Sequence, residues 1–163
     1  MFGIRFVVPL VLCSMACSSA PSAPGGNQPL PVVRLQPESF SFTYSSGLRE
    51  SQRLVVRDQG AWQEVWASIW RTHTPMPPLP AIDFSQDMVV VAALGERVTG
   101  GFSIFVDSAT EGPAGVTVAI RSVSPATGCG VTLALTQPVD IARLPRRNGA
   151  ISFDERGAVL ACQ

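Results

Sequence analysis

Alternation of apolar and polar residues predicts that most of this chain forms β-strands. Residues 102–107 and 116–121 both follow a period of two, which places successive side chains on opposite faces of a sheet. The segment Glu111–Gly115 between them contains two glycines and one proline, a composition typical of turns. These residues therefore predict two strands joined by a tight turn.

A continuous apolar run, Met88–Leu94, predicts a different kind of strand. A strand without alternation is expected at the centre of a sheet, where both of its faces are covered. Shorter patterns predict further strands at Ser39–Tyr44, Arg53–Arg57, Val131–Thr136 and Val139–Leu144, and a final hairpin of Ala150–Phe153 and Ala158–Cys162 around Asp154–Gly157.

One segment, Gly60–Arg71, has the period of an amphipathic helix, and Asp58 is placed to cap its N-terminus. Its apolar face holds all three tryptophans of the chain, together with two aliphatic residues: Trp62, Val65, Trp66, Ile69 and Trp70. This face either covers a sheet or offers an aromatic platform to a sugar or peptide. We favour burial against a sheet, with one tryptophan partly exposed at the helix end.

The helix is followed by a proline-rich segment, residues 73–80, which favours an extended connector over a ligand for a partner domain. Together, these patterns predict an α+β fold. We expect a β-rich domain of mainly antiparallel sheets, or a sandwich, packed around one Trp-rich amphipathic helix.

The first residues resemble a bacterial lipoprotein signal. Arg5 supplies a positive charge, Phe6–Leu12 supplies an apolar run, and small residues lead to Cys17. This resemblance implies that residues 1–16 are removed and that Cys17 is lipidated. An ordinary secreted protein and an uncleaved anchor are the alternatives.

Composition divides the rest of the chain into a flexible Ser-, Pro- and Gly-rich tether over residues 17–31 and one globular domain over residues 32–163. A lipidated chain would lie in the cell envelope, attached to a membrane by its acyl chains. Ser18 after the cysteine predicts the outer membrane if the host is Gram-negative.

Few residues in this chain are suited to catalysis. His73 is the only histidine, and its place after the predicted helix suits a cation near the helix C-terminus. The carboxylates show no paired spacing for acid–base chemistry. Gly95–Gly101 is glycine-rich, but a strand rather than a helix follows it, so it does not suit a phosphate. We predict no enzymatic activity, no cofactor and no metal site, and the zero net charge argues against nucleic acid as a partner.

Four cysteines are present, and two of them belong to the N-terminal region. The other two, Cys129 and Cys162, form one candidate pair in an oxidising compartment, and their spacing does not suit a zinc site. We predict a structural disulfide between them, with free buried thiols as the alternative.

A motif over Ile82–Val90 and Leu94–Ile104 resembles the C-terminal domain of the protease complex subunit PrcB family. It comprises Asp-Phe-Ser at 83–85, Leu-Gly-Glu at 94–96 and Thr-Gly-Gly-Phe-Ser-Ile at 99–104. The resemblance extends from about Phe40 to Leu144. It implies a small accessory subunit that stabilises a surface protease complex, and no catalytic residue carries over with it.

The glycines of this motif suit either a tight connection between strands or a surface that another protein's backbone approaches. On the second interpretation the candidate contacts to a partner are Arg97, Thr99, Gly100, Gly101 and Phe102, with the loop Ala126–Gly130 beside them. We therefore expect a non-enzymatic envelope lipoprotein that binds another protein, with a protease that it stabilises or inhibits as the candidate partner. The alternative is a binder of a small ligand or glycan that uses an exposed tryptophan.

Overall fold

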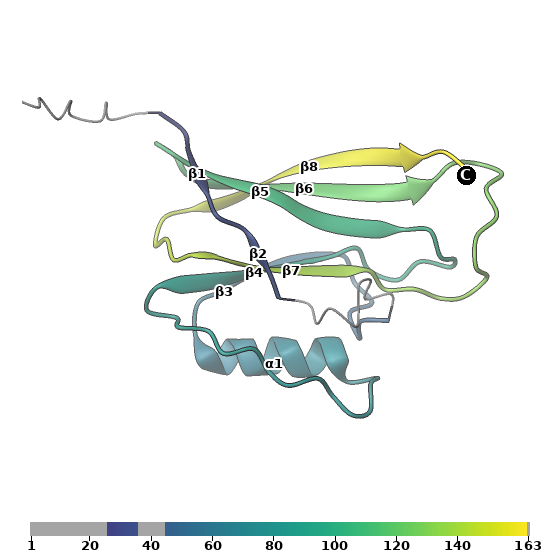
Figure 1. The fold of residues 1–163 in the computed structure, drawn as a ribbon, viewed down its shortest axis with the longest axis horizontal. Coiled ribbons are helices and arrows are strands. Elements are labelled where there is room, and N and C mark those ends of the chain that lie inside the picture. Colours follow the sequence, from purple (N-terminus) through teal and green to yellow (C-terminus); the bar gives the residue numbers. More distant parts are fainter. Residues whose placement is uncertain (1–25, 36–44, 163) are drawn as a thin grey trace, which may run out of the picture.

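Two four-stranded sheets and one helix stack as three layers in the computed structural model, which describes residues 26–35 and 45–162 (Figure 1). The outer sheet contains, in spatial order, β1 (Gln28–Leu30), β5 (Ser103–Gly112), β6 (Gly115–Pro125) and β8 (Ile151–Leu160). The middle sheet contains β2 (Val33–Arg34), β7 (Val139–Pro145), β4 (Asp87–Ala93) and β3 (Gln52–Val56). The helix α1 (Gln59–Trp70) covers the other face of the middle sheet (Figure 1). The predicted strand-rich α+β fold is confirmed.

Strand β4 divides its side chains between two hydrophobic cores. Met88, Val90 and Ala92 point toward the outer sheet, whereas the residues between them point toward the helix. All of these side chains are fully buried, because β4 has a neighbouring layer on each face. The prediction of a central strand covered on both faces is confirmed.

The helix begins and ends close to the predicted positions. The Asp58 carboxylate accepts a hydrogen bond from the Ala61 N–H, which satisfies one of the free donors of the first turn. Trp62, Trp66 and Trp70 are all buried, and their rings follow one another along the face that contacts the middle sheet. The expectation that one tryptophan is partly exposed is wrong, because the segment after the helix folds back over this row.

That segment is extended, as the four prolines predict, and the tryptophans fix it in place. The indole N–H of Trp62 donates to the carbonyl of Pro80, and that of Trp66 donates to the carbonyl of Pro77, both at 3.0 Å. Proline lacks an N–H but keeps its carbonyl oxygen, so a proline-rich connector can still accept these two bonds.

The C-terminal region differs from its prediction. In place of a hairpin, residues 151–160 form one strand, β8, that pairs with β6 in parallel. The chain reaches β8 from β7 in the middle sheet, so it crosses between the layers before it joins β6. The charged residues taken for a turn form ion pairs: Glu155 pairs with Arg53 of β3, and Asp154 pairs with Arg156 of β8 itself.

Two further differences concern shorter segments. Val131–Thr136, predicted as a strand, is a loop in which only Thr136 makes an isolated bridge. Gln28–Leu30 falls within the predicted tether but pairs with β5, so the folded region begins before residue 32. The strand predicted at Ser39–Tyr44 lies outside the described residues.

Candidate functional site

Two loops meet at one end of the sandwich, where they are fixed to one another by backbone hydrogen bonds. Residues 94–102 follow β4 and residues 126–137 follow β6, and together we call them the loop end. Arg97 and Thr136 exchange two backbone hydrogen bonds, of 2.7 and 2.9 Å. The Gly100 N–H donates to the Thr132 carbonyl at 2.8 Å, and the Thr136 hydroxyl donates to the Thr99 carbonyl at the same distance. The loop end is therefore an ordered surface.

Three large apolar side chains of the loop end point into solvent. Val98 is 79% exposed, Leu133 is 90% exposed and Leu135 is 59% exposed. Scattered exposed apolar residues are common on protein surfaces, but these three lie on two loops that are bonded to each other. Leu133 and Leu135 were missed as surface residues by sequence reasoning, because the alternation of 131–136 assigned that segment to a sheet.

The glycines of the motif have local structural roles. Gly101 has a φ of +85°, in the left-handed region, and a side chain there would press against Val131 and Pro125. Gly100 is buried, and its N–H is already bonded to Thr132. The backbone that approaches these glycines thus belongs to the chain's own loop, and the side chains around them form the accessible surface.

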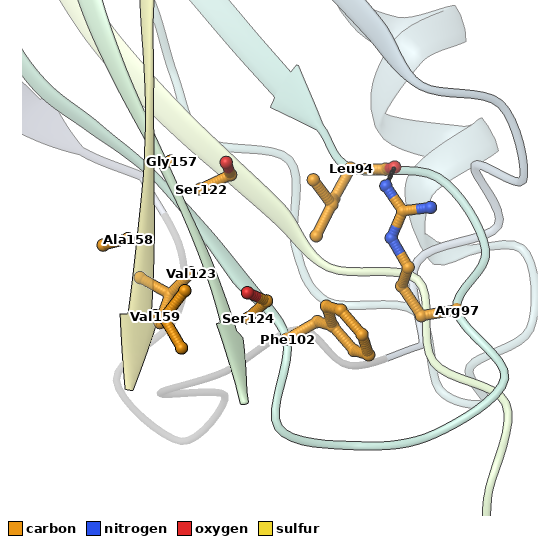
Figure 2. A pocket seen from close by; sticks show the side chains of 9 residues that line it. All are labelled: Leu94, Arg97, Phe102, Ser122, Val123, Ser124, Gly157, Ala158 and Val159. Atoms are coloured by element: carbon orange, nitrogen blue, oxygen red, sulfur yellow. Dashed lines mark hydrogen bonds between the residues drawn. The ribbon is translucent and has the colours of Figure 1, made fainter. Parts of the chain in front are cut away.

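A groove of about 500 Å³ opens beside the loop end (Figure 2). Leu94, Arg97 and Phe102 line one side of it, and residues of β6 and β8 line the other (Figure 2). The Arg97 guanidinium donates to the Leu94 carbonyl at 2.9 Å and lies 5.8 Å from the centre of the Phe102 ring. The groove therefore combines apolar side chains with one cation. Of the predicted contact residues, Arg97 and Phe102 line this groove. The other three do not line it and instead contact the 126–137 loop or Pro125: Thr99, Gly100 and Gly101.

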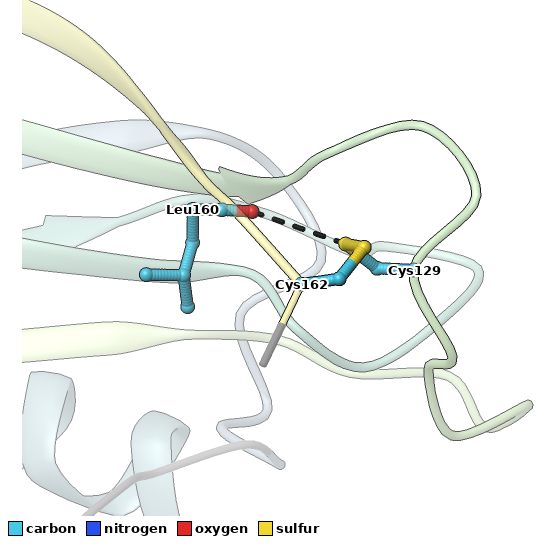
Figure 3. The surroundings of a disulfide bond; sticks show 3 residues. All are labelled: Cys129, Leu160 and Cys162. Atoms are coloured by element: carbon cyan, nitrogen blue, oxygen red, sulfur yellow. Dashed lines mark hydrogen bonds between the residues drawn. A yellow bond between two sulfur atoms is a disulfide. The ribbon is translucent and has the colours of Figure 1, made fainter.

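A disulfide between Cys129 and Cys162 joins the loop after β6 to the chain after β8 (Figure 3). The predicted pairing is confirmed. Beside it, the Ala126 N–H donates to the Leu160 carbonyl at 2.9 Å. The bridge and this hydrogen bond hold the last part of β8 next to β6, at the edge of the groove.

Among the described residues, the most deeply buried carboxylate is that of Asp140, and its contacts are structural. It lies on β7 and faces the outer sheet at the point where β1 has ended. Its carboxylate accepts a hydrogen bond from the Val106 N–H at 2.7 Å and pairs with Arg34 at 3.2 Å. Burial raises the pKa of Asp140, and the Val106 and Arg34 contacts oppose that rise. Asp140 thus supplies a hydrogen-bond acceptor to β5 beyond the residues that pair with β1.

We expect the Asp140→Asn variant to remove part of the pH dependence of stability. Because folding raises the pKa of Asp140, the folded protein holds this proton more tightly than the unfolded chain does. The Asp140 contribution to the free energy of unfolding is therefore largest below the ordinary pKa of 3.8 and decreases as the pH rises through the raised value. Urea unfolding between about pH 4 and about pH 7 measures this slope, and identical slopes for both proteins would contradict the prediction.

The one histidine of the chain, His73, also has a structural contact. The His73 ring packs edge-on against Trp70, with 5.0 Å between the ring centres. Over residues 26–35 and 45–162, no group of three or more metal-ligating side chains gathers. In the same residues, no helix is both long and apolar enough to span a membrane.

The fold and the loop end define the class of this molecule: a small layered β-rich domain with exposed apolar side chains on two ordered loops. Residues 88–145 match the family model described as PrcB C-terminal, which confirms the resemblance over this part of the chain. The matched part runs from β4 through β7 and includes both loops of the loop end. The family suggests association with a protease complex. No curated protein and no solved structure matches the chain.

Proposed function

We propose that this chain is a non-enzymatic subunit of an envelope protease complex and that it binds its partner protein through the loop end. The observation that carries the proposal is the exposure of Val98, Leu133 and Leu135 on two loops that hold each other in place. An ordered apolar surface loses little conformational entropy on association, so more of its burial contributes to affinity. Arg97 and Phe102 extend this surface into the groove.

The location in the envelope rests on the first residues of the chain. A lipid on Cys17 would keep the domain close to other envelope proteins, which raises its effective concentration near them. Such proximity favours a non-enzymatic subunit, because that subunit acts only while it is bound to its partner. We propose attachment to the membrane in this way; Cys17 lies outside the described residues.

The buried tryptophan row weakens the alternative of a glycan-binding protein. That alternative depends on an exposed indole ring, and Trp62, Trp66 and Trp70 are each at most 1% exposed. The three rings instead support the middle sheet and the proline segment, so the protein-binding function is the better supported of the two.

We expect the Leu133→Asp variant to bind its partner at least about tenfold more weakly than the wild type. Leu133 is the most exposed apolar residue of the loop end, and burying a carboxylate there on association is costly. The measurement is affinity capture of the full-length protein from solubilised envelopes, with quantification of the protease subunits that co-purify.

Ala114→Asp is the matched control, because Ala114 is exposed in the β5–β6 turn at the opposite end of the sandwich. Both variants should unfold at the temperature of the wild type, since neither side chain is buried. Equal recovery of a protease with Leu133→Asp and the wild type would reject the loop end as the contact surface.

A further inference from the structure

Exposed apolar side chains gather at one end of the sandwich. Among the residues that the structure describes, seven large apolar residues are exposed, and five of them lie at the end where β6 and β8 finish and where the loop end is found: Val98, Leu133, Leu135, Val159 and Leu160. The other two are Val33, in the short strand β2, and Met76, in the segment after the helix. The opposite end is formed by the β5–β6 turn and by residues 146–150, and we call it the turn end. None of these seven residues lies there.

The described part of the chain begins at the turn end (Figure 1). Strand β1 runs antiparallel to β5, with Gln28 opposite Glu111. A Cβ atom on Gly112, at the end of β5, would lie 2.9 Å from the Asn27 Oδ1 atom. Gly26 therefore lies beside the β5–β6 turn, so the chain that joins the domain to Cys17 starts from the end that lacks exposed large apolar side chains.

The segment between Cys17 and Gly26 is too short to place the loop end on a membrane end-on. Gly26 follows Cys17 by nine residues, so the two Cα atoms can lie at most about 30–32 Å apart. Strand β6 runs from the turn end to the loop end with 11 residues, a rise of about 33 Å, and the loop end extends beyond it. If the loop end rested on the bilayer, Gly26 would therefore stand farther from the surface than a lipidated Cys17 could reach.

The turn end is polar and suits a position next to lipid headgroups. Arg147 pairs with Glu111 at 2.7 Å, and Arg57 is followed by Asp58, the helix cap, so charges of both signs are present there. Because no large apolar side chain of the described residues is exposed at this end, it has nothing to insert into hydrocarbon. The lipid on Cys17 would therefore carry the attachment.

We infer that the membrane-attached domain holds its loop end away from the bilayer, and that the loop end contacts a protein domain which projects from the membrane. The contact surface of that partner would be apolar at its centre, because it covers Val98, Leu133 and Leu135. It would lie about 33 Å or more from the bilayer that holds Cys17. The inference rests on the proposed function and deepens it, since it states where the partner presents its contact surface.

The test measures how close each end lies to the lipid, with the full-length lipidated protein in vesicles of phosphatidylethanolamine and phosphatidylglycerol. A dye is attached at the loop end through Val98→Cys, and in a second preparation the same dye is attached at the turn end through Ala114→Cys. Both positions are exposed, so the fold should tolerate the label. A quencher on the lipid headgroups should quench the dye at position 114 at least about twofold more strongly than the dye at position 98, since a whole strand separates them.

Amide hydrogen exchange of the wild type gives a second measurement that needs no added cysteine. The Cys17→Ser variant supplies the same domain without a lipid. Residues 94–102 and 126–137 should exchange at the same rates in the wild type on vesicles as in this variant in solution. The same residues should exchange at least about threefold more slowly when the protease subunits that co-purify with the wild type are added, because the partner then covers them.

Equal quenching at positions 98 and 114, or exchange of the loop end that slows on vesicles alone, would overturn the inference, because the bilayer would then cover the loop end. A wild type that does not bind vesicles would also overturn it. So would light scattering that shows a dimer of Cys17→Ser which dissociates when Leu133→Asp is added to that variant, because the occupant would then be a second copy. If Leu133→Asp loses the protease while both dyes are quenched equally, the inference fails and the proposed function stands.

Discussion

Replacing Trp66 with alanine is expected to lower the free energy of unfolding by about 3–5 kcal/mol. Trp66 is 1% exposed and lies between Trp62 and Trp70, with ring centres 5.2 and 5.4 Å away. Its removal leaves a large cavity between the helix and the middle sheet, and the neighbouring rings cannot fill it. The carbonyl of Pro77 also loses its donor. Urea unfolding followed by circular dichroism measures the change.

Two variants separate the causes of this loss. Trp66→Phe keeps an aromatic ring but lacks the indole N–H, so we expect a smaller loss, of about 1–3 kcal/mol. Gln63→Ala, on the exposed face of the same helix, should change stability by less than about 0.5 kcal/mol. A loss for Trp66→Ala as small as that of Gln63→Ala would mean that the tryptophan row does not support the fold.

The elements that sequence predicted well are those whose burial leaves a local signature. Strand β4 needs an apolar residue at every position because it has a layer on each side, and that run is visible in the sequence. The helix has large apolar residues every three or four positions, which is the helical period, and Asp58 caps its N-terminus. In both cases, the hydrophobic pattern of a short segment directly reflects which side chains of that segment are buried.

The elements predicted wrongly depend on contacts between distant parts of the chain. Charged residues in the middle of β8 resemble a turn, but Glu155 forms an ion pair with Arg53, which lies more than a hundred residues earlier in the chain. Val131–Thr136 alternates like a strand, yet it lies beside the 94–102 loop and forms a β-bridge only at Thr136. Alternation describes how a segment would fit a sheet and does not supply the neighbouring strand.

The candidate site shows the same division. The motif predicted contact residues around Arg97 and Phe102, and the structure places both residues in the lining of the groove. The exposed Leu133 and the exposed end of β8 follow from the arrangement of the two sheets, which depends on a parallel pair formed across a crossover. Neither feature has a signature of its own in the sequence.

The double variant Cys129→Ser/Cys162→Ser is expected to lose about 3–4 kcal/mol of stability relative to the oxidised protein. The bridge joins residues 33 apart, and removing it gives the unfolded chain back the entropy that the closed loop had excluded. Cys162 is exposed and Cys129 is half-buried, so serine fits both positions and little packing is lost. Urea unfolding of both proteins measures the difference.

Reduction of the wild type should lower its stability to that of the double variant, and the same reductant should leave the double variant unchanged. The loss should first affect the end of β8, because the bridge holds that end beside β6 where the ladder of paired residues stops at Leu160. Amide exchange at Leu160 should then quicken before exchange at Ser152, whose N–H also faces β6 and lies toward the start of the same strand. Equal stability of the oxidised protein and the double variant would show that packing of β8 against β6 alone holds this edge, and the groove beside it would then not depend on an oxidising compartment.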